Sequence, residues 1–256
     1  MEYRVKWGYL TSSEIKQCAE ANGIVIIPIG SIEQHGPHLP VAADSIIAET
    51  VACRTAEGLW RKGIRSVVLP VVWLGNSLHH MDFSGTISLD FHTFAGVIFQ
   101  VCKSLRKHGF SRIVLLNGHG GNSHPLHVVL AQVNLALGIV ALGVDYWNAA
   151  RGEFAQILDS DSGIGHAGEA ETSLMLAIDP ELVKPHRMWR GPDVPDPEEL
   201  ASGAMYTFRT FRARTKIGVS GDASQASRSK GERLLNAITQ HLVEMLSRES
   251  LWEIRL

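Results

Sequence analysis

The stretch that organises the chain is residues 24–48, which read IVIIPIGSIEQHGPHLPVAADSIIA. An apolar run over 24–29 has the length and composition of a buried strand, and a polar loop follows it. Carboxylate and imidazole side chains gather after this strand: Glu33, His35, His38 and Asp44. Such residues are ligands for divalent metal ions, although a solvated loop in which a carboxylate caps a helix gives the same local pattern. The rest of the chain decides between these two interpretations.

Apolar strands alternate with amphipathic helices on both sides of this stretch. We predict strands over 24–29, 66–73, 113–116 and 139–144, and helices over 12–21, 44–60, 90–108, 123–137, 166–178 and 230–248. Short, continuous apolar strands between helices favour an α/β fold with a mainly parallel sheet covered by helices on both faces, a three-layer sandwich. We interpret residues 1–256 as one domain, with an irregular stretch at about 183–227 that forms a lid or an oligomer contact.

Composition narrows the class of protein. The chain is 45% hydrophobic and 20% charged with a formal net charge of −2, which gives no electrostatic reason to expect nucleic acid or membrane partners. The N-terminus lacks a signal-peptide pattern, and we find no segment long and apolar enough to span a membrane. Cys18, Cys53 and Cys102 are odd in number and far apart, so we expect free thiols and a cytoplasmic location.

Polar side chains follow each predicted strand at its carboxyl end, where ligands bind in parallel sheets. His119 lies in the glycine-rich turn NGHGGN, which fits neither common nucleotide-binding glycine motif and instead lets the backbone bring the imidazole close to the loop of Glu33. We expect substrate contacts from three further residues of this rim: His80, Gly120 and Trp147. For Trp147, a place in the core is the alternative.

The sequence GHAGEAETS at 165–173 adds a histidine and two acids. In a helix starting at His166, Glu169 shares a face with His166 and Glu171 points elsewhere. We therefore predict Glu169 as a metal ligand and interpret Glu171 as an acid that interacts favourably with the helix dipole.

Charge counting favours two metal ions over one. Glu33, Asp44 and Glu169 with one hydroxide balance two divalent cations, with His35 and His119 as neutral ligands, whereas one ion would leave excess negative charge. Asp44, with two oxygens, is the natural bridging residue. A pair of ions about 3.5–4 Å apart would hold a water molecule and lower its pKa towards neutrality.

These motifs resemble the creatininase (creatinine amidohydrolase) family, through GSIEQHGPHLP with Asp44, FSGTISL, NGHGGN, HAGEAETS and GVSGDAS. The resemblance implies a creatininase-type α/β fold, a binuclear site of zinc, manganese or iron, and a homohexamer. Carried over by position, it implies that Glu33, His35, Asp44 and His119 bind metal and that His166 is a catalytic-site histidine. His166 would pass a proton to the leaving nitrogen.

Two positions depart from the family pattern. Creatininase proper places a metal-binding Glu two residues after the turn histidine, where this chain has Gly121, and we expect Glu169 to replace it. Creatininase also places a Trp-Asp pair before the catalytic-site histidine, where this chain has Ser162 and Gly163. A substrate other than creatinine is therefore expected.

The sequence thus predicts a metal-dependent amidohydrolase acting on a non-peptide C–N bond of a small molecule, either a cyclic amide or a formamide. The same site cleaving another bond is the first alternative, as in hydrolases that open cyclic ketones or in a peptidase of redox-cofactor maturation. A metal-holding assembly protein without catalysis is the second alternative.

Overall fold

The computed structural model describes residues 5–160, 164–190 and 205–253. Four parallel strands form one sheet in the order β2-β1-β3-β4. They are β1 (Ile24–Ile29), β2 (Ser66–Val68), β3 (Arg112–Asn117) and β4 (Val140–Asp145). Because Ile29 is paired with Asn117 and Asn117 with Asp145, the last residues of three strands stand in register at one edge of the sheet.

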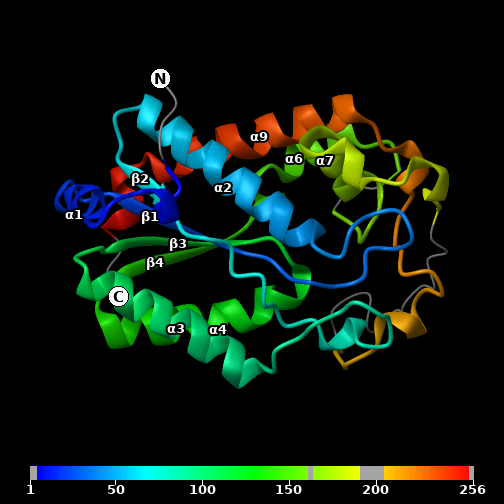
Figure 1. Ribbon diagram of the computed structural model, residues 1–256, viewed down its shortest axis with the longest axis horizontal. Coiled ribbons are helices and arrows are strands. Elements are labelled where there is room, and N and C mark those ends of the chain that lie inside the picture. The colour runs from blue at the N-terminus through cyan, green and yellow to red at the C-terminus, as the bar shows by residue number, and fades with distance from the viewer. Residues whose placement is uncertain (1–4, 161–163, 191–204, 254–256) are drawn as a thin grey trace.

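Helices cover both faces of the sheet, as Figure 1 shows. One face carries α2 (Ala43–Arg61), α5 (Tyr146–Ala149), α6 (Arg151–Ile157), α7 (Glu169–Ile178) and α9 (Arg228–Leu246). The other face carries α1 (Ser12–Glu20), α3 (Phe91–Lys107) and α4 (Ser123–Leu137). The predicted three-layer α/β fold with a parallel sheet is confirmed.

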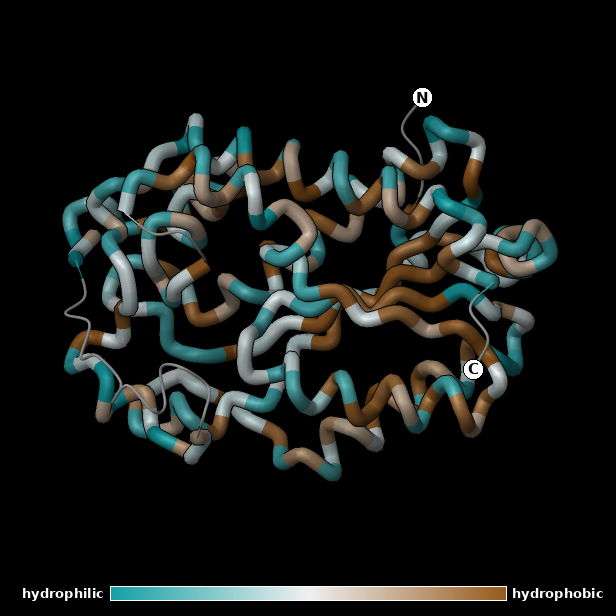
Figure 2. The backbone as a smooth tube through the Cα atoms, turned by 180° about the vertical axis from the view of Figure 1, so that it is seen from behind, coloured by the Kyte–Doolittle hydropathy of each residue, from teal (hydrophilic) through white to brown (hydrophobic). Residues whose placement is uncertain are grey.

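The two cores follow from the alternation of side chains along a strand. Ile24 and Ile26 of β1 pack on the α2 face, whereas Val25 and Ile27 pack on the α3 face. Each such buried side chain contributes roughly 1.5–3 kcal/mol to stability. Figure 2 shows the strands as hydrophobic along their length and the chain becoming more hydrophilic past their ends.

Several boundaries of strands and helices differ from those predicted from the sequence. The second strand ends at Val68 rather than at residue 73, because Pro70 has no N–H for the ladder; past it, Val72 makes an isolated bridge to Ile29. The helix predicted from His166 begins at Glu169, and α5 and α6 lie where no helix was predicted.

The stretch at 183–227 contains short 3-10 turns in its described parts. Residues 191–204 and the departures at Ser162 and Gly163 lie outside the described residues. The single-domain assignment and the lid or contact role stay predictions.

The chain order places a topological switch point between β1 and β3. From β1 the chain runs to β2 on one side, and from β2 it crosses to β3 on the other. Ligands in such sheets bind where the order reverses, beyond the carboxyl ends of the strands. The loops after β1 and β3, which hold Glu33 and His119, meet at this point.

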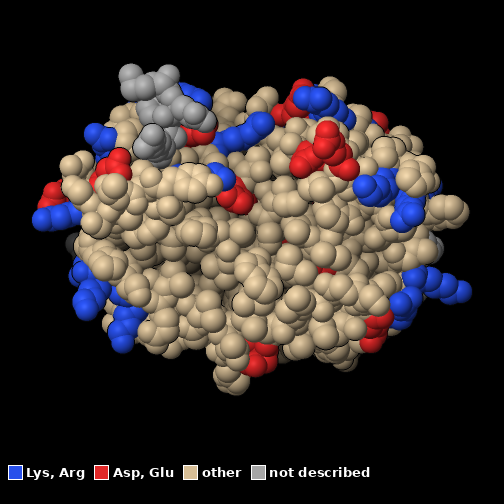
Figure 3. Space-filling view, viewed as in Figure 1, with Lys and Arg blue, Asp and Glu red and all other residues tan. Residues whose placement is uncertain are grey.

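Charged side chains of one sign do not dominate the face shown in Figure 3. Basic and acidic side chains are interspersed around its periphery, and its centre is mostly uncharged. Among the described residues, none of the helices combines the length and apolarity needed to cross a bilayer. Cys18, Cys53 and Cys102 are free thiols, as predicted.

Candidate metal centre

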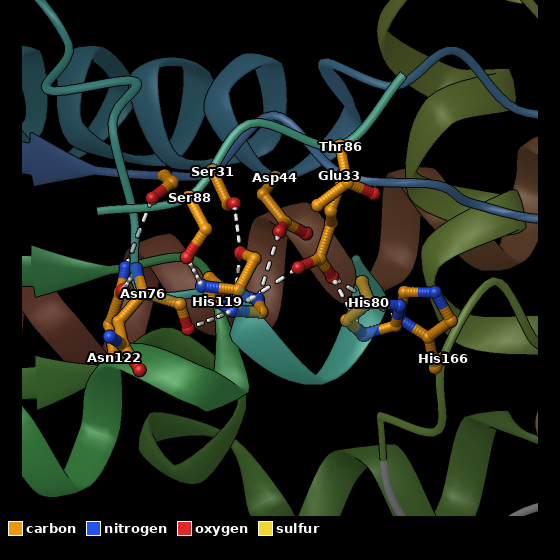
Figure 4. Close-up of polar contacts among 12 residues, drawn as sticks. Ser31, Glu33, Asp44, Asn76, His80, Thr86, Ser88, His119, Asn122 and His166 are labelled. Carbon is orange, nitrogen blue, oxygen red and sulfur yellow. Dashed lines mark hydrogen bonds and ion pairs between the residues drawn. The ribbon is translucent and has the colours of Figure 1, made fainter. Parts of the chain in front are cut away.

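The loop after β1 and the start of α2 place two carboxylates side by side. The backbone N–H of Glu33 donates to the carbonyl of Val41 at 3.0 Å, which folds the loop back on itself. Asp44 lies in the first turn of α2, and Ser45 beside it donates to the carbonyl of Ser31 at 3.0 Å. Both carboxylates are therefore buried at the end of the sheet, next to His119 (Figure 4).

The turn after β3 is held by its two asparagines. The Asn117 side chain accepts from the N–H of His119 at 3.1 Å and donates to the His119 carbonyl at 2.8 Å. Asn122 donates to the carbonyl of Gly30 at 3.0 Å, which ties this turn to the loop after β1. A Cβ on Gly118 would lie 2.7 Å from the carbonyl oxygen of Asp44, so glycine lets α2 approach the turn.

Asp44 stands between two imidazoles. Its Oδ1 is 3.0 Å from Nε2 of His35, and its Oδ2 is 3.2 Å from Nδ1 of His119. The Nδ1 of His35 contacts the carbonyl of Glu33 at 3.1 Å, and Nε2 of His119 contacts the carbonyl of Asn76 at 3.2 Å. A histidine that ligates a metal commonly donates its other N–H to such a carbonyl. For His35 the nitrogen facing Asp44 is thus the one available as a ligand, whereas Nε2 of His119 also lies 3.2 Å from Oε2 of Glu33.

The charges of this site suit cations. Both oxygens of Glu33 and Oδ2 of Asp44 are buried without a hydrogen-bond partner. Burial opposes protonation of His35, but the charge and hydrogen bond of Asp44 outweigh it and raise the pKa of His35 to about 10. Burial likewise opposes protonation of His119, yet Glu33 and Asp44 raise its pKa well above the usual range. Without metal, protonated imidazoles stand in for the missing positive charge, so the donor set fits divalent ions.

The structure places Glu171 at this site and Glu169 away from it, so the predicted helix phase was wrong. Oε2 of Glu171 lies 3.7 Å from Nε2 of His35, and its ligand atoms cluster with those of His35 and His166. Glu169 instead pairs with Lys230 and accepts from the N–H and Oγ of Ser160 at 2.8 and 2.6 Å.

The error has a local cause. His166 precedes α7 in an extended bridge to Ser220, and Ala167 has φ +50°, so no helical spacing connects His166 to Glu169. Gly168 occupies the N-cap, which makes Glu171 the third helical residue. From there its Oε2 accepts from the N–H of Ala167 at 2.6 Å, as the acid of a capping box reaches back. Gly168 was the signal in the sequence for the start of the helix at residue 169, and therefore for the face on which each acid lies.

The buried carboxylate of Glu171 is electrostatically unfavourable in its charged form without a metal ion. Burial raises its pKa to about 7, with the charge of His35 opposing and the charge of Asp44 adding to the rise. By contrast, hydrogen bonds from Lys230 and Ser160 outweigh burial and lower the pKa of Glu169. A buried carboxylate beside other carboxylates is stable as an anion only when cations join it.

His166 lies at the edge of the cluster in a group of rings that pack against one another at tilted or edge-on angles. Its Nδ1 is 3.6 Å from Oε1 of Glu33, and its ring centroid is 4.5 Å from that of His80. Phe211, from the irregular stretch, packs on both rings with centroid distances of 4.4 and 4.7 Å. Sequence reasoning did not find Phe211, because no period marks that stretch.

The predicted substrate contacts fall into different environments. His80 is buried with its Nε2 3.4 Å from Oε1 of Glu33. Gly120 is exposed, with open space where a Cβ would be. Trp147 packs edge-on against Tyr146 at 5.2 Å and joins the core on the α2 face. Gly121 adjoins His119, since a Cβ there would lie 2.4 Å from its Nε2.

Comparisons with known proteins agree with this geometry. The family model described as "Creatininase: Creatinine amidohydrolase" matches residues 8–246. A mycofactocin precursor peptide peptidase of Mycobacterium ulcerans is 31% identical over 246 residues, covering 94% of this chain and 91% of that protein. A creatinine amidohydrolase of Pseudomonas putida is 31% identical over 263 residues, covering 94% and 96%.

Solved structures extend the likeness to three dimensions. A crystal structure of creatinine amidohydrolase superposes with a TM-score of 0.85 at 29% identity, covering 96% of this chain and 97% of that one. Structures described as a manganese creatininase and as a Zn-Zn type of a mutant creatininase match with a TM-score of 0.82 each. A more distant relative is the 3-dehydro-scyllo-inosose hydrolase of Thermotoga maritima, 26% identical over 70% of this chain and 57% of that protein.

Proposed function

The chain belongs to the creatininase family of hydrolases, and on that premise we propose that it is a binuclear metal-dependent hydrolase of a small amide. The observation that carries the proposal is the convergence of three buried carboxylates with two imidazoles: Glu33, Asp44 and Glu171 with His35 and His119. A structural role alone does not account for carboxylate oxygens that are buried without hydrogen-bond partners.

The donor set divides into two groups that share Asp44. His119 and Glu33 would hold one ion and His35 and Glu171 the other, with Asp44 shared between them. Glu171 thereby takes the role that we had predicted for Glu169. When bound, such ions supply Lewis-acid polarisation of a carbonyl and acidify a water molecule. We propose zinc, manganese or iron, because imidazole and carboxylate ligands suit these metals.

His166 would move the proton. Its Nε2 lies 2.8 Å from the carbonyl of Gln34, which leaves Nδ1 directed at Glu33. Burial and then the charge of His35 hold the pKa of His166 well below its usual range. A neutral ring would take a proton from the attacking water before it gives one to the leaving nitrogen. This order refines the acid role expected from the sequence.

A substrate panel tests the proposed reaction. The metal-loaded protein should hydrolyse lactams or formamides faster than cyclic ketones and short peptides, measured by substrate depletion against metal-free protein. Preferential hydrolysis of cyclic ketones would assign the site to another bond. Complete inactivity of a protein with two bound ions would favour the metal-holding alternative.

Peptide hydrolysis is the second candidate. The peptide peptidase of M. ulcerans and the creatinine amidohydrolase of P. putida are equally similar to this chain at 31% identity. Peptide cleavage with no activity on lactams or formamides would select it. The homohexamer and the cytoplasmic location also stay predictions, and sedimentation of the metal-loaded protein tests the first.

A further inference from the structure

Gln34 lies between two proposed ligands in the sequence and reaches two histidines with its side chain. The residue is 6% exposed. Its Nε2 is 2.9 Å from Nδ1 of His80 and 3.0 Å from Nε2 of His166. The carboxamide therefore contacts both imidazoles that adjoin Glu33. Figure 4 shows these two rings, of His80 and His166, on the side of Glu33 away from Asp44.

The orientation of this carboxamide is fixed by the backbone around it. Oε1 of Gln34 accepts from the N–H of Gly36 at 3.0 Å. A backbone N–H only donates, so the oxygen must face Gly36 and the NH2 group must face the histidines. Gly218 makes room for this side chain: its φ is +76°, and a Cβ there would lie 1.8 Å from Oε1 of Gln34.

The NH2 group determines where the proton of His80 sits. An amide NH2 only donates, so Nδ1 of His80 must accept and the neutral ring carries its hydrogen on Nε2. The Nε2 of His80 lies 3.4 Å from Oε1 of Glu33, although this oxygen has no hydrogen-bond partner in the folded chain. Ligand atoms of Glu33, His80 and His166 lie within 4.8 Å of one another, close enough to share an ion. A neutral His80 that carries its hydrogen on Nε2 and accepts from Gln34 at Nδ1 has no lone pair to offer to such an ion.

His166 meets both the backbone and the side chain of Gln34 at one nitrogen. Its Nε2 is 2.8 Å from the carbonyl oxygen of Gln34 and 3.0 Å from Nε2 of the Gln34 side chain. The carbonyl oxygen requires a donor and the NH2 group requires an acceptor, so these two contacts set no single tautomer for His166. Gln34 therefore determines the tautomer of His80 alone.

We propose that Gln34 is a positioning residue that selects the tautomer of His80, so that His80 presents an N–H rather than a lone pair on the side of Glu33 and is excluded from the metal ligands. The tautomer follows from the hydrogen bonds alone. The consequence for metal binding rests on the proposed function.

The test replaces the donor with an acceptor of the same shape. In Gln34→Glu, one oxygen still accepts from Gly36 and the other accepts from His80, so the hydrogen of His80 should move from Nε2 to Nδ1. Nitrogen-15 spectra of histidine-labelled, metal-free protein report the tautomer, with His80→Asn identifying the signals. Gln34→Met, which keeps the bulk but removes the donor, should give a mixture of tautomers.

Metal content provides the second measurement. With Nε2 freed, zinc bound per chain should rise from about two ions to about three in Gln34→Glu, and return to about two in Gln34→Glu combined with His80→Asn. An unchanged zinc content in Gln34→Glu would overturn the exclusion of His80 from the ligands. A wild-type His80 with its hydrogen on Nδ1, or a tautomer unaffected by Gln34→Glu, would overturn the proposal as a whole.

These outcomes stay separate from the proposed function. If wild-type protein binds none of zinc, manganese and iron, the metal centre is wrong, yet the spectra of metal-free protein still decide the role of Gln34. If wild-type protein binds two ions and the tautomer does not respond, Gln34 is an ordinary buried amide and the metal centre stands.

Discussion

Two acids two residues apart on α7 occupy opposite environments. Glu169 is surrounded by donors: Lys230, the N–H of Asp159 at 3.0 Å and the hydroxyl of Ser160. Glu171 accepts one N–H and otherwise faces His35 among other carboxylates. The charge of Glu169 is compensated by groups of the folded chain, whereas the charge of Glu171 requires a bound cation. A satisfied buried carboxylate holds the chain together, whereas an unsatisfied one marks where a ligand binds.

The largest effect should come from the residue shared by both ion sites. Asp44→Ala should lose both ions and lower activity by more than about a thousandfold, because a Lewis acid supplies several kcal/mol of transition-state stabilisation and 1.36 kcal/mol is tenfold in rate. Elemental analysis and turnover measure this. Asp159→Asn, which changes a carboxylate paired with Lys230, is the control and should keep both ions. Retention of one ion in Asp44→Ala would show that Asp44 does not bridge.

His166 should affect rate without affecting metal content. His166→Asn removes the proton carrier, so kcat should fall by about 10²–10⁴-fold while both ions and the melting temperature are kept. The decrease should be smaller for amides with good leaving groups, which need less protonation. His241→Asn alters an exposed pair with Glu153 and serves as the control. Loss of an ion in His166→Asn would make His166 a ligand.

Substitution of one acid of α7 should affect metal binding and activity, and substitution of the other should affect stability. Glu171→Gln should lose one ion and lower activity by at least the roughly 10–100-fold typical of residues that only orient ligands. Glu169→Gln should keep both ions and activity but destabilise the protein by about 1–3 kcal/mol, since it leaves buried donors poorly paired. Metal content, turnover and urea unfolding compare the two variants. If Glu169→Gln lost metal and Glu171→Gln did not, Glu169 rather than Glu171 would be the ligand.

The smallest effect is a pH dependence of metal-free protein. Burial raises the pKa of Glu171 to about 7 from its ordinary 4.5, so its charge costs nothing below pH 4.5 and the full penalty above pH 7. The melting temperature of Glu171→Gln minus that of wild type should therefore increase from about pH 4.5 to about pH 7 and then level off. Glu169, whose pKa is lowered, should give no such rise. A difference that is flat with pH would show that Glu171 keeps an ordinary pKa.

The sequence was sufficient to predict the features that depend on regular runs of apolar residues. The parallel sheet, the ligands at the carboxyl ends of its strands and the proximity of Glu33 to Asp44 and His119 all follow from apolar runs that end in polar loops. Glu171 was missed because helical spacing was extended back through Gly168, where the backbone is not helical. Gln34 was missed because its role depends on contacts with His80 and Gly218, which are remote in sequence.

The packing of α9 has a consequence for how the protein is made. Ser227, the N-cap of α9, donates its N–H to Ser173 of α7 at 3.1 Å, and Lys230 of α9 pairs with Glu169. A growing chain emerges N-terminal end first at about 5–20 residues per second, so α9 leaves the ribosome after all five proposed ligands. The group of Glu33, Asp44 and His119 can assemble as soon as β3 pairs with β1, whereas α7, which carries Glu171, gains its contacts with α9 only after α9 has emerged. We therefore expect the two ions to be acquired in sequence during synthesis, the second marking completion of the fold.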